Sequence, residues 1–441
     1  MARILLCFYQ NIIENDYRNL GLFYEQLSTE FATAGNDVLV LNMGNFRENW
    51  ISDKVFHENE LKTAVETFDP DIVIAFNNQV FPSLFNAVSC PIVIWTADTL
   101  PYFPHRDLIA EHLPRYRVVS TNRDTDDFRK AGFDAGQILH LKLATSLKSE
   151  NLPQDKEISF IGTKFGLDQN LFKRNTPAAL SKAYRCFLES HAYDYKTFFD
   201  DKTLLNEDVW NFFDLRNIVL TALTEFDLHL YGIGWDSLKD HLPQLYGCFE
   251  KKRVFSLRHN QDIYNSSKIC LSVSHPQAQG KAYPWRIMDI MASNGCLVTQ
   301  YSSQLKEETA GWVDLPMYHT PMEARDLCAT LLRDESRRRE IVKASQKYVE
   351  ANARWPARIK QLGDFLNIPL INASRKGGVE IIPPVQTFSA LQPLYLYLQS
   401  NQETTSYRLL RLLFRGAVCL IPKKELRHRL RKDFSLTKAR T

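Results

Sequence analysis

Cysteine pairs at metal-binding or redox spacing are missing from this chain. Its eight cysteines are scattered over 441 residues, and no C-x-x-C pair occurs among them. This excludes the usual zinc and dithiol redox motifs. Several of the cysteines fall in apolar stretches, where a free thiol behaves as a small hydrophobic side chain. The pattern favours a protein of the reducing cytoplasm.

Long apolar runs are also missing. No stretch approaches the roughly 18–20 continuous apolar residues of a membrane-spanning helix. The N-terminal segment MARILLCFYQNIIEND has a short apolar run that is followed by polar and acidic residues, so we expect no signal peptide. A hydrophobic fraction of 44% and a charged fraction of 24% are typical of a globular protein. At this length, two domains and an appendage are expected.

Positive charge is concentrated at the C-terminal end. Residues 408–440 hold 11 Lys and Arg against 2 Asp and Glu, whereas the whole chain has a net charge of only +3. Residues 405–432 alternate leucines and arginines at helical spacing, which predicts a basic amphipathic segment at an anionic membrane surface. The alternatives are a helix packed on the protein body or a disordered tail. We expect no nucleic-acid binding, because no nucleic-acid motif accompanies the charge.

Apolar runs alternate with amphipathic segments along most of the chain. The runs ARILLCFY, DVLVLNM, DIVIAF, PIVIW and YRVVS show no polar alternation, which is typical of a parallel sheet covered on both faces. A polar stretch, TSLKSENLPQDKE, separates them from a second series that begins with ISFIGTKFG. The sequence predicts two tandem Rossmann-like α/β domains, over 1–147 and 157–350, with a closing helix and a basic tail over 351–441.

The second series contains the most informative motif. YNSSKICLSVS is followed by a polar loop, a helix that begins near Trp285, and the strand CLVTQ. Together with WTADTLP in the first series and DESRRREIVKASQKYVEANARW further on, this order resembles the CgeB-like glycosyltransferases, relatives of the group 1 enzymes with the GT-B fold. The resemblance implies a nucleotide-sugar donor site in the second domain and an acceptor site in the first.

Four residues carry the donor side of the resemblance. Arg286 occupies the first turn of the helix and Lys281 the preceding loop, so both are expected to meet the donor phosphates. The resemblance implies that Asp289 binds the ribose hydroxyls and that Gly295 completes the motif. The alternatives are a surface arginine and an i,i+3 pair between Arg286 and Asp289.

Glycines and one histidine add to the predicted donor site. Gly162 in FIGTKFG and Gly232 and Gly234 in LYGIGW would let the backbone approach a phosphate closely. His275, in an HP pair after a strand, resembles the histidine of bacterial sialyltransferases and Kdo transferases that use CMP-sugars. We expect His275 to be a catalytic or donor-binding residue, with CMP as a less favoured donor nucleotide than UDP, GDP or ADP.

Polar residues follow the first-domain strands. Asp98 comes after PIVIW and is expected to orient or deprotonate the acceptor hydroxyl, although a turn aspartate is an equal alternative. Asn77 and Asn78 follow DIVIAF, and Glu14 and Asp16 lie in the first strand-to-helix loop. These four are expected on the acceptor side.

The prediction is therefore a glycosyltransferase that uses neither a metal nor a separate cofactor. It moves a sugar from a nucleotide donor to a cell-envelope glycan or its lipid-linked precursor, in the cytoplasm or at the inner face of the membrane. The alternatives are a CMP-sugar transferase of the same fold, a sugar-nucleotide epimerase, and a non-catalytic component of envelope or spore-surface assembly. The choice between retention and inversion stays open.

Overall fold

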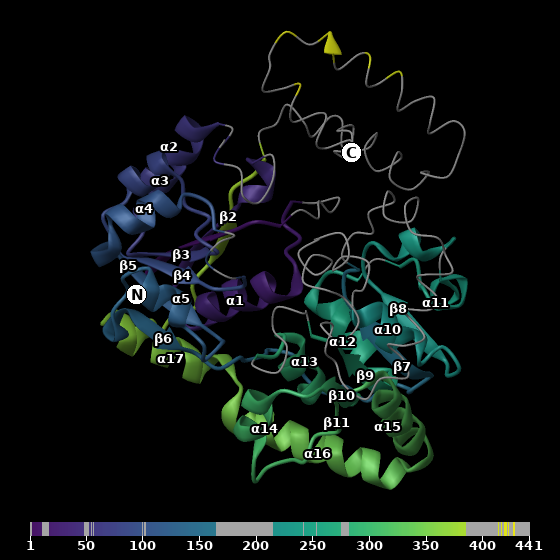
Figure 1. The fold of residues 1–441 in the computed structure, drawn as a ribbon. Helices are drawn as coiled ribbons and strands as arrows, with labels where there is room; N and C mark the ends of the chain where they lie inside the picture. Colours follow the sequence, from purple (N-terminus) through teal and green to yellow (C-terminus); the bar gives the residue numbers. More distant parts are fainter. Residues whose placement is uncertain are drawn as a thin grey trace.

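The computed structural model contains two parallel sheets, each covered by helices on both faces (Figure 1). It describes residues 2–10, 17–47, 57–98, 103–164, 215–240, 242–252, 254–274 and 282–384, with isolated positions at 53, 55, 100, 413, 416, 419, 420, 422 and 427. The prediction of two Rossmann-like units is confirmed. Two further segments lie almost wholly outside the described residues: the long helical insertion predicted within the second unit, after ISFIGTKFG, and the basic segment 405–432.

The N-terminal sheet has seven strands, all parallel. In spatial order they are β12 (Val379–Ile381), β2 (Asp37–Asn42), β1 (Arg3–Phe8), β3 (Ile72–Phe76), β4 (Ile92–Trp95), β5 (Tyr116–Ser120) and β6 (Ile138–His140). Alternate residues of β1 enter different cores: Leu5 and Cys7 pack on one face, and Ile4, Leu6 and Phe8 on the other. This explains why the strands are apolar throughout.

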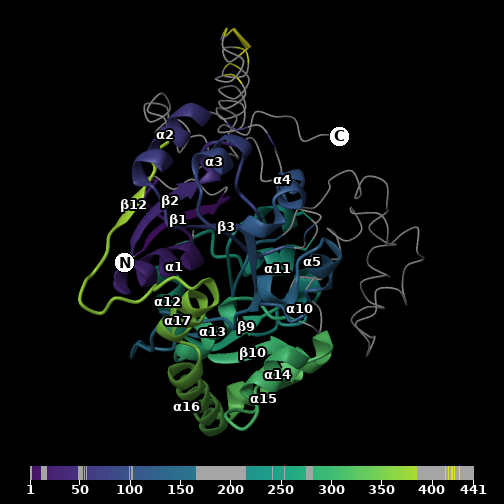
Figure 2. The same ribbon diagram turned by 90° about the vertical axis from the view of Figure 1, so that its left-hand side faces the viewer.

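Short helices cover the two faces of this sheet. They are α1 (Leu22–Thr33), α2 (Glu58–Phe68), α3 (Pro82–Ala87), α4 (Arg106–Glu111) and α5 (Asp126–Lys130). Figure 2 shows α1 beside α12 (Leu257–Asn265) and α13 (Arg286–Ala292) of the second unit. The helix α1 therefore contacts the second unit.

The second sheet has five parallel strands. In spatial order they are β11 (Met317–Tyr318), β10 (Cys296–Gln300), β9 (Ser267–Ser272), β7 (Lys156–Ile161) and β8 (Leu228–Tyr231). Two cores again lie on its faces. Two further strand-like stretches of the sequence, RVFSL and WVDLP, form no strand in their described residues. The first leads into α12, and the second precedes the two-residue β11.

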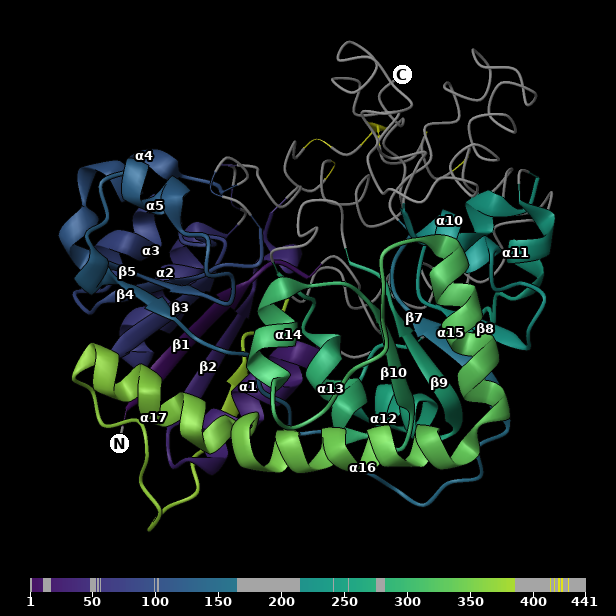
Figure 3. The same cartoon turned by 60° about the horizontal axis from the view of Figure 1, so that its bottom comes forward.

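Helices of the second unit lead the chain back to the first. Besides α12 and α13 they are α10 (Leu215–Thr221), α11 (Pro243–Gly247), α14 (Ser303–Thr309), α15 (Pro321–Arg333) and α16 (Glu335–Asn352). Figure 3 shows α16 running under the second sheet and continuing into α17 (Trp355–Leu366) under the first. Residues of α17 join a core of the first sheet, and β12 then pairs with β2.

The chain thus crosses between the units twice, once near residue 145 and once near residue 353. The sequence predicts a closing helix and a basic tail over residues 351–441. It does not predict that this part of the chain returns to the first sheet through α17 and β12. None of the helices in the described part of the chain has the length and apolar character needed to cross a membrane.

Candidate active site

Two arginines of the second unit meet at the carboxyl end of β7. The guanidinium carbon of Arg286 lies 5.5 Å from the centre of the Phe160 ring, and that of Arg216 lies 6.0 Å from the same centre. Arg216 donates a hydrogen bond to the carbonyl of Thr163, two residues beyond the end of the strand. In open parallel sheets, ligands bind at the carboxyl ends of the strands, so this is the position where a donor is expected.

Arg286 itself is half-buried in the first turn of α13. Its Nη1 donates a long hydrogen bond of 3.4 Å to the carbonyl of Val273, just after β9. No carboxylate of the described residues forms an ion pair with it. Burial lowers the pKa of Arg286, and the nearby Tyr264, Asp289 and Tyr318 oppose this shift. A desolvated guanidinium in this setting is suited to an anionic ligand.

Sequence reasoning missed two further cations here. Arg216 and Lys164 are 4% and 3% exposed, and both lie next to Thr163. Lys164 belongs to the motif FIGTKFG, and its position shortly after a strand could have identified it as a candidate donor-site residue. Arg216 follows a long insertion, and nothing in its sequence context connects it with β7.

The three predicted loop glycines are needed for packing between two loops. A Cβ at Gly232 would lie 2.2 Å from the carbonyl oxygen of Gly162, and one at Gly234 would lie 2.5 Å from that of Lys164. Both have positive φ, at 123° and 90°. The indole of Trp235 also donates to the Gly162 carbonyl at 2.9 Å. The glycines therefore hold the β7 and β8 loops together, which fixes the position of the cations.

Replacing Gly232 by alanine is expected to destabilise the protein by about 2–4 kcal/mol, since it adds both backbone strain and a steric clash. Urea denaturation measures the effect. Gly247 in α11 is the matched control, because a Cβ there meets no atom within 4 Å. Gly247→Ala is expected to leave stability unchanged or raise it by up to about 1 kcal/mol. Equal stability of the two variants would contradict the close approach of these loops.

Gly295 does not lie with these residues. It precedes β10, at the amino-terminal end of the sheet, whereas Arg286 lies at the carboxyl end. A Cβ at Gly295 would lie 2.2 Å from the sulfur of Cys270 and 2.6 Å from the carbonyl of Tyr264. Its predicted donor-binding role therefore does not fit its position, and close packing explains why glycine is needed there.

Asp289 is buried, with 3% of its surface exposed. Its Oδ1 accepts hydrogen bonds from Nε2 of Gln26 at 3.0 Å and from the Thr145 hydroxyl. Both donors belong to the N-terminal side of the molecule. Burial raises the pKa of Asp289 to about 6, although these two hydrogen bonds and the charge of Arg286 oppose the shift. The ribose-binding role of Asp289 stays a prediction.

Four other predicted site residues lie outside the described residues. They are Glu14, Asp16, His275 and Lys281. Their roles in acceptor binding, catalysis and donor binding stay predictions.

On the acceptor side, the structure brings Asn77 and Asp98 together. Asn77 donates to the Asp98 carboxylate at 2.7 Å, and its own oxygen accepts the backbone N–H groups of Ala97 and Asp98 at 2.8 and 3.0 Å. Asn77 adopts a positive φ of 47° to do so. Partial removal of water raises the pKa of Asp98, while the Asn77 amide opposes the shift. This geometry orients the carboxylate at the carboxyl ends of β3 and β4.

Asn78 has a different task. It is fully buried, and its amide donates to the carbonyls of Pro104 and His105 at 2.9 and 3.2 Å. It therefore anchors the loop after β4. The predicted acceptor contact of Asn78 has no support in this arrangement.

Aromatic rings connect the two sides. Phe23 of α1 stacks on Trp285, the residue before Arg286, with ring centres 3.6 Å apart. It also contacts Tyr24, Phe76, Trp95 and Trp355 edge-on, at 5.5–6.1 Å. The charge of Asp98 contributes to the raised pKa of Tyr24, so the carboxylate lies near this cluster. The donor-side and acceptor-side groups therefore border one aromatic cluster.

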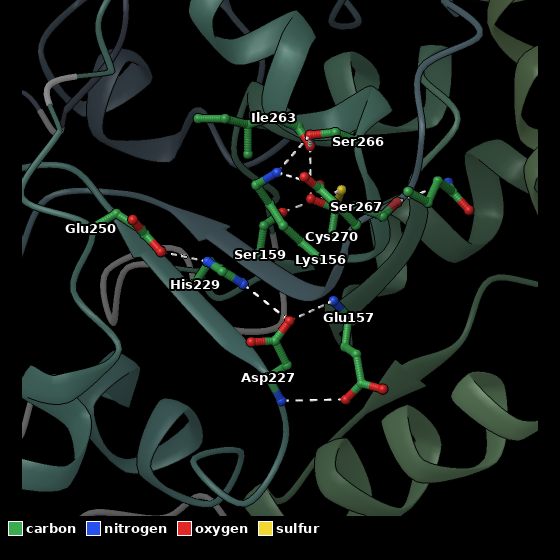
Figure 4. Close-up of polar contacts among 12 residues, drawn as sticks. Lys156, Glu157, Ser159, Asp227, His229, Glu250, Ile263, Ser266, Ser267 and Cys270 are labelled. Carbon is green, nitrogen blue, oxygen red and sulfur yellow. Dashed lines mark hydrogen bonds and ion pairs between the residues drawn. The ribbon is translucent and has the colours of Figure 1, made fainter.

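Figure 4 shows a polar network at the other end of the second sheet, where β7 and β8 begin. His229 contacts Glu250 at 2.5 Å through Nδ1 and Asp227 at 3.1 Å through Nε2. These residues and Glu157 lie at the amino ends of β7 and β8, away from the arginines. In the described part of the chain, no group of three or more His, Cys, Asp or Glu side chains could hold a metal ion.

Two facing Rossmann-like units, with cations at the strand ends of one and an oriented carboxylate at the strand ends of the other, define a protein with the GT-B fold. Residues 215–364 match the family model described as "Glycosyl transferase-like". This match to part of the chain agrees with the resemblance to group 1 glycosyltransferases and indicates a glycosyltransferase. The match covers the second unit from α10 onward and most of α17, and leaves out β7.

Several solved structures are similar to this chain, and the one with a TM-score above 0.5 agrees on the fold. Sucrose-phosphate synthase from Thermosynechococcus elongatus has a TM-score of 0.52 at 12% identity, covering 83% of this chain and 98% of that one. Anabaena HepE in complex with UDP and glucose has a TM-score of 0.49 at 11% identity, covering 83% and 100%. T4 phage BGT with its UDP-glucose substrate has a TM-score of 0.44 at 10% identity, covering 83% and 98%. No curated protein matches the sequence at a significant level.

Proposed function

We propose that this glycosyltransferase takes a nucleoside-diphosphate sugar as its donor. One observation carries the proposal: Arg216 and Arg286 both lie beside the Phe160 ring at the end of β7, and the buried Lys164 follows three residues after that strand. Three cations match a diphosphate, which bears about two negative charges, better than the single phosphate of a CMP-sugar. The CMP-sugar alternative is accordingly the weaker one.

The chemistry follows from this charge. When the sugar leaves, negative charge grows on the diphosphate, and cations already fixed in place stabilise it without reorganisation. Arginine is especially suited, since its planar guanidinium donates two parallel hydrogen bonds to a phosphate. Transfer without a metal ion is part of the proposal, because the side chains at β7 can carry this stabilisation.

Asp98 is proposed to orient or deprotonate the acceptor hydroxyl. The support is its carboxylate, held by Asn77 at 2.7 Å at the strand ends of the first unit. A raised pKa makes a carboxylate a better proton acceptor at neutral pH. The acceptor is proposed to be a cell-envelope polysaccharide or its lipid-linked precursor, at the cytoplasmic side of the membrane, and the basic composition of 405–432 supports this choice.

A nucleotide screen tests the donor class. We expect UDP, GDP, ADP or dTDP to raise the melting temperature, and CMP to raise it less at the same concentration. A nucleotide at 100 times its dissociation constant adds about 2.7 kcal/mol to the free energy of unfolding. The sugar form of the best nucleotide should then be hydrolysed slowly without acceptor. A chain that binds CMP more tightly than every diphosphate would contradict the proposal.

A further inference from the structure

The two crossings of the chain between the units meet beside Asp289. At the first crossing, the backbone N–H of Thr145 donates to the carbonyl of Ala353, which belongs to the second crossing, at 3.0 Å. Arg354 then donates to the carbonyls of Thr145 and Leu147 at 2.9 and 2.7 Å. The two crossing segments are therefore bonded directly to each other.

Gln26 of α1 joins both segments to the second unit. Its Oε1 accepts the backbone N–H of Ser146 at 2.7 Å and the indole N–H of Trp355 at 3.3 Å. Its Nε2 donates to Asp289 at 3.0 Å. The Thr145 hydroxyl donates to the same carboxylate oxygen and accepts the N–H of Leu147 at 2.9 Å. The carboxylate of Asp289 on α13 thus accepts hydrogen bonds from α1 and from the first crossing segment.

Further contacts of α1 lie on either side of this carboxylate. Glu25 accepts the backbone N–H of Leu257, at the start of α12, at 2.8 Å, and Leu22 donates to the carbonyl of Phe255 at 3.1 Å. Phe23 stacks on Trp285 at the start of α13. The helix α1 is therefore bonded to the same short helix, α13, that carries Arg286. Any rotation of the first unit relative to α13 has to break these bonds.

We propose that Asp289 is a positioning residue, which locks the first unit to α13 through Gln26 and Thr145 and so sets the orientation of the acceptor side relative to Arg286. Its proposed task differs from that of a ribose ligand. A ribose ligand acts on the donor alone, whereas this carboxylate acts through groups of the other unit. The expected effect of Asp289 on sugar transfer rests on the proposed function. The coupling of the two units through Asp289 does not depend on that function.

The test removes the two side chains that donate hydrogen bonds to Asp289 and leaves Asp289 in place. Thr145→Val deletes one hydroxyl at nearly constant volume, and Gln26→Leu deletes the amide. We expect both variants to bind the nucleoside diphosphate within about twofold of wild type by calorimetric titration, while the transfer or donor-hydrolysis rate falls at least tenfold. In scanning calorimetry, we expect the wild type to unfold in a single transition and both variants to unfold in a broader transition or in two. Thr33→Val, an exposed change on the same helix, is the control and should match the wild type in all three measurements.

Two other results with these variants would contradict the positioning role of Asp289. A loss of nucleotide affinity in proportion to the rate would assign these residues to donor binding and overturn the proposal. Unchanged rate and unchanged calorimetry in both variants would overturn it as well. If the wild type binds no nucleotide, the proposed function fails, and scanning calorimetry together with small-angle scattering still tests the coupling. In that case unaltered unfolding and an unaltered radius of gyration would overturn it.

Discussion

Replacing Arg286 by alanine is expected to weaken nucleoside-diphosphate binding at least a hundredfold. The guanidinium is half-buried, and no carboxylate of the described residues forms an ion pair with it. A charge-assisted pair with a desolvated phosphate is worth about 3 kcal/mol, which corresponds to roughly a hundredfold in the dissociation constant. Calorimetric titration of wild type and variant with the best nucleotide from the screen measures the difference.

The same change should not destabilise the unliganded protein. Burial lowers the pKa of Arg286, which means that the charged side chain is held at a cost when no anion is present. Arg286→Ala is therefore expected to unfold at the same urea concentration as the wild type or at a higher one. Binding sites commonly reduce stability in this way.

Arg337 supplies the matched control. It is exposed on α16, away from β7, so Arg337→Ala should bind the nucleotide like the wild type. Arg286→Lys should recover only part of the affinity, because an ammonium group cannot make two parallel hydrogen bonds to a phosphate. Unchanged binding in Arg286→Ala would contradict the donor site at β7.

The fold was largely predictable because its strands are buried on both faces. Runs such as DVLVLN and CLVTQ carry apolar residues at consecutive positions, and the structure places both as interior parallel strands, each second from an edge of its sheet. The strand β12 was not predictable. Its residues VEI are mostly exposed, and only its pairing with β2, more than 300 residues earlier, makes it a strand.

The site was predictable where function follows the local sequence. Arg286 follows from a strand-loop-helix motif, and Asn77 and Asp98 from their places after strands. Arg216 was not predictable, because its link to β7 depends on the tertiary contact with Thr163. The contacts of Asp289 were not predictable from the sequence either. It lies one turn after Arg286 in a motif that implies a donor ligand, yet its hydrogen-bond partners are 263 and 144 residues away in the sequence.

Replacing Asp289 by asparagine is expected to remove a pH dependence of stability. Burial raises the pKa of the carboxyl group from 3.8 to about 6, against the opposing effects of Thr145, Gln26, Arg286 and Arg354. Because the native pKa lies above the unfolded one, the native state keeps a proton that the unfolded state has already released. The free energy of unfolding therefore falls as the pH rises from about 4 to about 6. The separation of the two pKa values corresponds to about 3 kcal/mol.

Asparagine keeps an oxygen that accepts the bonds from Gln26 and Thr145, but it carries no charge. Relative to the wild type, Asp289→Asn should therefore gain about 3 kcal/mol between pH 4 and pH 7, as measured by urea denaturation at each unit of pH. Asp364→Asn, which changes an exposed carboxylate on α17, is the control and should show no such gain. A difference between Asp289→Asn and wild type that stays constant with pH would contradict the burial of this carboxylate. If the gain appears, the native carboxylate is ionised at neutral pH at a cost in stability, and its charge strengthens the two hydrogen bonds that it accepts from the other unit.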